Sequence, residues 1–136
     1  MAVSHVFHCD RCPSEAGRVT LYARGETIPS RGDGEVDQVM TQVANTSAGQ
    51  PRLEILSPVG NMTVFEFDAD AALAAAGAGD VRSLYGLDPE YVPFWCPMCD
   101  ASYCAQHWVT WILFDDGFFD EKRGRCPEGH ERRLMD

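Results

Sequence analysis

Residues 93–108 read PFWCPMCDASYCAQHW and hold four candidate metal ligands in one short stretch. Cys96 and Cys99 are separated by two residues, and so are Cys104 and His107. Two side chains at this spacing lie across a tight turn and can both reach one tetrahedral ion at about 2.0–2.3 Å. The stretch therefore predicts two half-sites, each of which needs a second pair of ligands.

Two further pairs lie far from this stretch, Cys9 with Cys12 near the N-terminus and Cys126 with His130 near the C-terminus. All six cysteines of the chain then belong to a pair. In a reducing compartment they are poor candidates for disulfides. Four pairs fill two closed sites, so the sequence predicts two zinc ions, each held by three thiolates and one imidazole.

The spacing leaves three ways of combining the pairs. Sequential pairing joins the first pair with the second and the third with the fourth, whereas nested pairing makes residues 96–107 one local site. In cross-brace pairing one ion is held by Cys9, Cys12, Cys104 and His107, and the other by Cys96, Cys99, Cys126 and His130. Chain closure excludes none of these arrangements, because its entropic cost grows only logarithmically with loop length.

The remaining histidines, His5 and His8, lie just before Cys9. Either could replace a ligand of the first pair, but the site needs only four. We expect both to be strand or loop residues, or hydrogen-bond donors around the site.

Composition narrows the class of protein. The chain has 136 residues and a net charge of −10, with Lys122 as its one lysine. Nucleic-acid binding depends on clustered cations that meet phosphates, so this charge argues against it. The longest apolar run, about five residues, is too short to cross a membrane. Because residues 1–12 carry charges where a signal peptide has its apolar core, we expect a cytoplasmic protein.

We expect one domain over residues 1–136, with a zinc module formed by residues 5–12 and 93–133 and an α+β insertion at 13–92. Periodicity and turn residues predict the elements of the insertion. They are a strand at 18–23, a loop at 28–34, a helix at 35–44, a hairpin of strands at 52–56 and 62–67, and an alanine-rich helix in 68–80 that Gly77 and Gly79 break early. No phosphate loop, acidic metal cluster or nucleophile beside a histidine is recognisable there.

The residues after the third pair have helical spacing. Trp108, Trp111 and Ile112 are at i, i+3 and i+4, which predicts a helix leaving the turn. Gly117 would end that helix. The two tryptophans are expected in the core of the zinc module, although exposed aromatic residues also serve as anchors for partners.

The stretch PFWCPMCDASYCAQHW resembles the central segment of cross-brace zinc fingers of the AN-one type. Over the whole chain, the order of the four pairs is similar to that of RING domains, with a short gap between the second and third pairs and a Cys-Pro turn at the end. The resemblance favours the cross-brace pairing and implies a RING-like treble-clef module. The long insertion is foreign to those families, and His130 stands where a RING domain normally has cysteine.

The resemblance implies a ubiquitin-ligase scaffold, similar to small RING-like proteins that accompany ubiquitin-like conjugation in some bacteria. Such a scaffold has no catalytic side chain and promotes transfer by positioning a conjugating enzyme and its ubiquitin-like cargo. The implied partner-binding residues are Trp108, Trp111, Ile112, Pro127, Arg132 and Arg133. The alternative is a protein-interaction module with structural zinc and no ligase activity.

Overall fold

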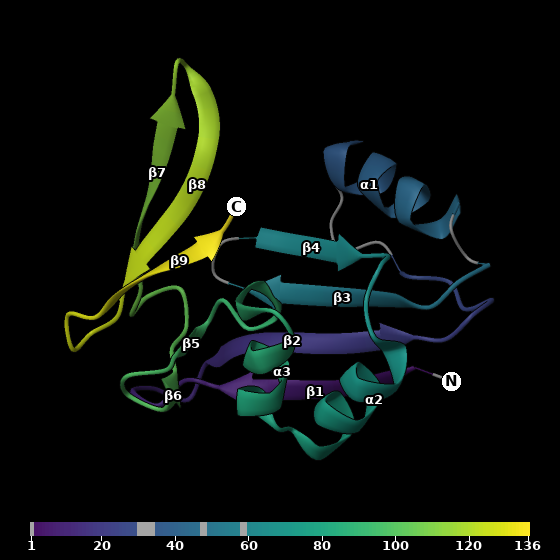
Figure 1. The fold of residues 1–136 in the computed structure, drawn as a ribbon, viewed down its shortest axis with the longest axis horizontal. Helices are drawn as coiled ribbons and strands as arrows, with labels where there is room; N and C mark the ends of the chain where they lie inside the picture. The colour runs from purple at the N-terminus through teal and green to yellow at the C-terminus, as the bar shows by residue number, and fades with distance from the viewer. Residues whose placement is uncertain (1, 30–34, 47–48, 58–59) are drawn as a thin grey trace.

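The computed structural model describes residues 2–29, 35–46, 49–57 and 60–136. It combines antiparallel sheets with few helices, in agreement with the predicted α+β class (Figure 1). The elements are β1 (Val3–His8), β2 (Glu15–Tyr22), α1 (Glu35–Thr46), β3 (Arg52–Ser57), β4 (Gly60–Val64), α2 (Ala69–Ala78), α3 (Val81–Leu87), the 3-10 helix η1 (Pro89–Tyr91), β5 (Trp95–Cys96), β6 (Ala101–Ser102), β7 (Val109–Asp115), β8 (Phe118–Arg125) and β9 (Glu131–Met135).

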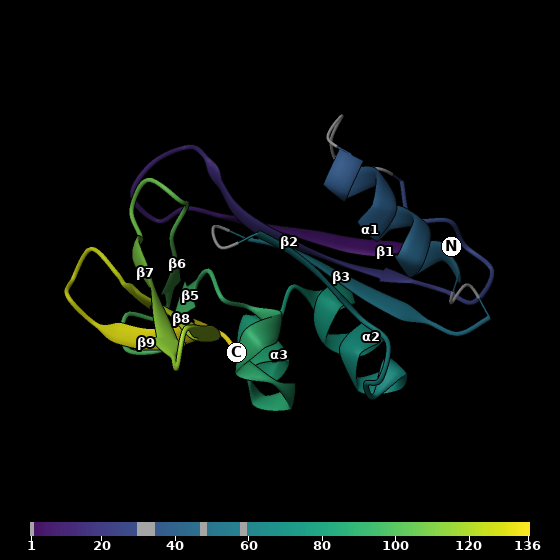
Figure 2. The same ribbon diagram turned by 90° about the horizontal axis from the view of Figure 1, so that it is seen from above.

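The first four strands form one sheet in the order β1-β2-β3-β4. Side chains alternate between the faces of a strand, so the apolar residues of β2 and β3 share one face. Val19 is aligned with Ile55, and Leu21 with Leu53. All four are buried with three alanines of α2, namely Ala72, Ala75 and Ala76. Figure 2 shows α2 and α3 on one side of the sheet and α1 on the other.

Most elements predicted for the insertion are present. The strands predicted at 18–23, 52–56 and 62–67 correspond to β2, β3 and β4, and β3 pairs antiparallel with β4 as expected for a hairpin. Strand β4 ends at Val64, earlier than predicted. The helix predicted at 35–44 is α1. Of the loop predicted at 28–34, residues 30–34 lie outside the described part of the chain.

Helix α2 differs from its prediction at one glycine. The Asp68 side chain caps its N-terminus by accepting from the Ala71 amide at 3.1 Å. Gly77 lies within the helix rather than breaking it, and Gly79 ends it at φ 65° in the left-handed region. A Cβ at Gly79 would lie 2.4 Å from the His5 ring. Position 79 therefore needs glycine both for its backbone conformation and for the close approach of His5.

The helix predicted after His107 is wrong, because these residues form strand β7. The chain makes one turn, in which the Trp108 amide donates to the Cys104 carbonyl, and then becomes extended. Valine, threonine, tryptophan and isoleucine at 109–112 favour strands. Asp116 and Gly117, at φ 49° and 82°, form the two-residue turn between β7 and β8. Positive φ at both positions is typical of a type I′ hairpin turn, so Gly117 turns a hairpin instead of ending a helix.

Strand β1 joins the predicted zinc-module segment 5–12 to the sheet of the insertion. It pairs along its length with β2 as an edge of the four-stranded sheet. The remaining strands form a two-stranded sheet, β5-β6, and a three-stranded sheet, β7-β8-β9. In Figure 1 the β7–β8 hairpin projects away from the four-stranded sheet. The four-stranded sheet thus leads directly into the first candidate ligand, Cys9.

Candidate metal centres

The four Cys/His pairs converge into two clusters. In each cluster the four candidate ligand atoms all lie within 4.8 Å of one another. One cluster contains Cys9, Cys12, Cys104 and His107, and the other contains Cys96, Cys99, Cys126 and His130. The first pair thus joins the third and the second joins the fourth, which is the membership that cross-brace pairing predicts. Each of the two Cys3His groups could hold a metal ion.

The first cluster is assembled from two turns far apart in the sequence. One turn links β1 to β2, and the Asp10 amide in it donates to the Ser102 carbonyl of β6 at 2.9 Å. The other turn follows β6. The Nδ1 atom of His107 lies 3.4 Å from Cys9 Sγ and 3.3 Å from Cys104 Sγ, and the sulfurs of Cys12 and Cys104 are 3.6 Å apart.

The second cluster has the same form. The Nδ1 atom of His130 lies 3.6 Å from Cys96 Sγ, 3.2 Å from Cys99 Sγ and 3.5 Å from Cys126 Sγ. The sulfurs of Cys99 and Cys126 are 3.8 Å apart. Both histidines therefore present Nδ1 to their sulfurs, and in both clusters the first residue of each pair is buried and the second is half-buried.

These distances suit a tetrahedral ion. With metal–sulfur bonds of about 2.3 Å and metal–nitrogen bonds of about 2.05 Å, the edges of a tetrahedron are about 3.8 Å between two sulfurs and about 3.6 Å between sulfur and nitrogen. The observed separations of 3.6 and 3.8 Å between sulfurs agree with such edges. They are far longer than a disulfide bond of about 2.05 Å, and all six cysteines are free thiols.

The turns themselves orient the sulfurs. The amide of Arg11 donates to Cys9 Sγ at 3.4 Å, and the amide of His130 donates to Cys126 Sγ at 3.3 Å. Arg11 also forms an ion pair with Glu128, which lies in the turn between Cys126 and His130. This pair joins a turn of the first cluster to a turn of the second. Both of its side chains are solvent-exposed, so it contributes little to stability.

The cysteine thiols differ in pKa, and the two extremes of the first cluster, Cys12 and Cys104, shift in opposite directions. The side chain and the amide of Ser14 lower the pKa of Cys12 to about 7. Burial raises the pKa of Cys96 to about 11 and also raises that of Cys104. A metal binds the thiolate form, so an ion must displace a proton from Cys96 at neutral pH, whereas the lowered pKa of Cys12 favours its thiolate.

A small core surrounds the clusters. Tyr103, Trp108 and Leu134 are buried together with four of the cysteines. The Trp108 indole donates to the Phe94 carbonyl at 3.2 Å, so this tryptophan is a core residue and is not free to anchor a partner. A Cβ at Gly124 would lie 2.6 Å from a methyl group of Leu134. The close approach of β8 to this core therefore requires glycine.

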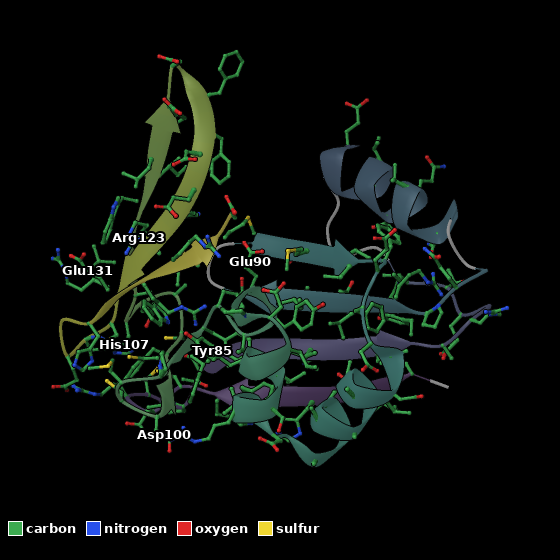
Figure 3. All side chains as sticks on the ribbon, viewed as in Figure 1. Tyr85, Glu90, Asp100, His107, Arg123 and Glu131 are labelled. Carbon is green, nitrogen blue, oxygen red and sulfur yellow. The ribbon has the colours of Figure 1, made fainter. Side chains whose placement is uncertain are left out.

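Arg132, which was also expected to contact a partner, is buried in the structure. It is only 9% exposed. Its guanidinium donates to the carbonyls of Val92 at 3.0 Å, Trp95 at 2.6 Å and Pro89 at 2.8 Å, and it lies over the Tyr85 ring (Figure 3 labels Tyr85). Arg132 therefore fastens β9 to the segment that precedes the first cysteine of the second cluster.

The other predicted partner residues are more accessible. Ile112, Pro127 and Arg133 are exposed, and Arg133 pairs with Asp136 at 3.6 Å. Trp111 is half-buried beneath the Arg125 guanidinium. His5 and His8 belong to neither cluster. His5 instead packs against the Phe7 ring, with ring centres 4.7 Å apart.

The sequence interpretation missed the exposed apolar surface of the β7–β8 hairpin. Phe114, Phe118 and Phe119 are 66%, 77% and 48% exposed, and Val109, Ile112 and Leu113 are exposed as well. The sequence does carry a signal for this hairpin, since Asp116-Gly117 lies between two apolar runs and an Asp-Gly pair in such a context indicates a tight hairpin turn. The helical spacing of the two tryptophans obscured it.

The strands of the hairpin begin and end next to ligand residues of both clusters. Strand β7 begins two residues after His107 of the first cluster, β8 ends one residue before Cys126 of the second, and β9 begins one residue after His130. Figure 3 shows His107 near sulfur atoms at the end of the molecule where the hairpin starts, with Arg123 and Glu131 above it. The base of the hairpin therefore lies next to ligand residues of both clusters.

The chain belongs to the family described as a domain of unknown function, DUF8328, whose model matches residues 1–136. No curated protein and no solved structure matches the chain. Among the described residues, no helix has the length and apolar character needed to cross a membrane.

Proposed function

We propose that the chain binds two structural zinc ions and acts as a protein-interaction module that presents the β7–β8 hairpin to a partner. Three thiolates and one imidazole form a common donor set of structural zinc sites. Thiolate ligands favour soft or borderline metals, and tetrahedral geometry with sulfur and nitrogen donors favours zinc. Four protein ligands leave no coordination position for water, so neither ion would activate a nucleophile.

The observation that supports an interaction role is the exposed apolar surface of the β7–β8 hairpin, whose base adjoins both clusters. Exposed apolar side chains that gather in one place often mark a site of protein association. Aromatic residues also supply much of the energy of protein interfaces, and three phenylalanines lie at this tip. In the proposed role the metals hold the two strands rigid, which lowers the entropy lost when a partner binds.

Site-specific photo-crosslinking in cells of the source organism tests this function. A photoreactive residue at Phe118 should give a discrete adduct with a partner, because this side chain is 77% exposed at the hairpin tip. The matched control carries the same residue at Leu73 of α2, an exposed apolar position away from the hairpin. The adduct should disappear when Cys126→Ser is added. No adduct from Phe118, or equal adducts from both positions, would contradict the proposal.

A ubiquitin-ligase scaffold is the second candidate, supported by the interleaved membership of the two clusters and by exposed Pro127 and Arg133. Arg132 cannot serve as the bridging arginine without leaving its buried position, so the role would fall to Arg133. Adding the chain to a cognate conjugating enzyme charged with its ubiquitin-like protein should then accelerate discharge. Arg133→Ala should reduce this acceleration about tenfold while leaving zinc content unchanged. No acceleration by the wild-type chain would exclude the ligase role.

A further inference from the structure

Strand β7 is an edge strand with no partner on its outer side among the described residues. It is the first strand of the sheet β7-β8-β9 and is hydrogen-bonded to β8 alone. Six of its seven residues are exposed, and only Trp111 is half-buried. In Figure 1 the outer side of β7 faces away from the four-stranded sheet. A row of backbone donors and acceptors is therefore open to pairing by another strand.

Over residues 109–114 this edge lacks two of the features that usually prevent strands from pairing with other chains, although its register with β8 shifts between Leu113 and Phe114 and the strand ends at Asp115. Edge strands are commonly protected by charged residues or proline. Residues 109–114 contain neither, and Ile112 and Leu113 place exposed apolar side chains on opposite faces of the strand. The other edge of the same sheet, β9, is protected, since it carries Glu131 and Arg133 on its surface. The two edges of one sheet thus differ in their readiness to pair.

We propose that the β7 edge pairs with the β7 edge of a second copy of this chain, antiparallel about a two-fold axis at Ile112. The proposal rests on the hairpin being the interaction surface and names its occupant. Full overlap of two antiparallel copies of the strand Val109–Asp115 places Ile112 opposite Ile112 and Trp111 opposite Leu113. The same patch then serves both copies, as in most protein dimers. Two three-stranded sheets would become one sheet of six strands.

Charge on the hairpin favours a second copy in the antiparallel orientation. The tip carries Asp115, Asp116 and Asp120, whereas the base carries Arg123 and Arg125. Antiparallel pairing places the acidic tip of each copy beside the basic base of the other. In particular, Asp115 would lie opposite Val109 of the second copy, which is itself aligned with Arg125.

The alternative orientation is unfavourable for the same residues. Parallel pairing would put Asp115 opposite Asp115, and like charges directly opposite each other destabilise a sheet. Both arginines of the base are already ion-paired, Arg123 with Glu121 and Arg125 with Glu131. The Arg125–Glu131 pair does not prevent the antiparallel arrangement, because both of its side chains are about half exposed and such surface pairs are weak. An edge contact of one strand is a small interface, so we expect a reversible dimer with a dissociation constant on the order of 10 μM.

Sedimentation velocity of the zinc-loaded full chain, from about 1 to about 300 μM, tests the proposal. The wild type should pass from monomer to dimer over this range. Ile112→Lys should weaken the dimer at least tenfold, because the two-fold axis would bring the two lysines together. Leu73→Lys is the matched control, since Leu73 is 43% and Ile112 44% exposed, and it should dimerise like the wild type.

A charge-reversal pair locates the axis. Ile112→Glu should also weaken self-association, but an equimolar mixture of the Ile112→Lys and Ile112→Glu chains should dimerise at least as well as the wild type. Zinc content and circular dichroism should match those of the wild type in every variant, which separates loss of pairing from loss of folding. Rescue in the mixture would support an axis at Ile112.

Two results would overturn the proposal. If the wild type stays monomeric over the whole range, the second copy is not the occupant. If a dimer forms that Ile112→Lys leaves unchanged, pairing occurs elsewhere on the molecule. Neither result would remove the interaction role, which is decided separately by adducts from Phe118. A foreign protein captured there by a monomeric chain would retain the proposed function while excluding self-pairing.

Discussion

Strands β2 and β7 have nearly the same length but opposite surroundings. Six of the eight residues of β2 are buried, whereas β7 has no buried residue. The sheet that contains β2 is stabilised by an apolar cluster shared with α2 and α3. The sheet that contains β7 has a small core in which four of the seven buried residues are cysteines. We therefore expect the first half to fold by apolar burial and the second to need metal at its two Cys3His clusters.

Removing zinc should give the largest effect and tests this comparison directly. Chelation should release β7, β8 and β9, because structural zinc in small fingers contributes about 10–16 kcal/mol to folding. The sheet β1-β2-β3-β4 should remain folded on its apolar core. Hydrogen exchange with and without chelator would show loss of protection in residues 109–135 alone. Equal loss in β2 and β3 would mean that the two halves unfold as one unit.

Disrupting one cluster at a time should separate the two metal sites. Cys9→Ser should reduce zinc to about one ion per chain, because each site needs all four of its ligands. The NMR signals of the His107 ring should change, while those of His130 remain. Cys126→Ser is the reciprocal control and should affect His130. A change at His130 in the Cys9→Ser chain, with His107 unaffected, would refute the pairing seen in the structure.

Arg132 connects the two halves, so its removal should cost more than that of its neighbour. Arg132→Ala removes a charged donor from three carbonyls of residues 89–95, of which those of Pro89 and Val92 keep a backbone donor, and it should destabilise the fold by about 3 kcal/mol. Arg133→Ala should change stability by less than about 0.5 kcal/mol, because Arg133 is exposed. Urea unfolding of the zinc-loaded variants measures both. Equal effects would show that the buried arginine does not fasten the halves together.

Adding one methyl group to a glycine of the apolar half should give the smallest change in stability. A Cβ at Gly17 would lie 2.2 Å from the buried Phe94 ring, so Gly17→Ala should destabilise the fold by about 1–3 kcal/mol. Gly86 of α3 has open space at this position, and Gly86→Ala should stabilise by up to about 1 kcal/mol through helix propensity. Thermal unfolding should therefore shift in opposite directions, and a shift in the same direction would contradict this packing.

Local patterns predicted most elements of the apolar half. Alternating apolar residues indicated β2, β3 and β4, and helical spacing indicated α1, because each pattern is set within one turn or one strand. The same reasoning failed for residues 108–112, where spacing over a short run cannot separate a helix from a strand. The Asp116-Gly117 turn and the partner strand β8 decide in favour of a strand.

Spacing alone also identified all eight residues of the two clusters, since a ligand pair is a local feature of the chain. Their interleaved grouping agrees with the cross-brace expectation, although the helix that also favoured it is absent.

The burial of Arg132 had no local signal, because its acceptors at residues 89–95 lie about forty positions earlier in the chain.

The sequence by itself determined the residues of both candidate metal clusters and the strands β2, β3 and β4 of the apolar sheet, because each depends on residues that are neighbours in the chain. Only the tertiary structure decided which pairs meet, which arginine is buried and which strand is left as an open edge. These properties depend on contacts between distant segments, and loop closure discriminates among such contacts only weakly. Strand β7 is an example, since its composition suits a buried strand and yet it lies exposed beside the two candidate metal clusters.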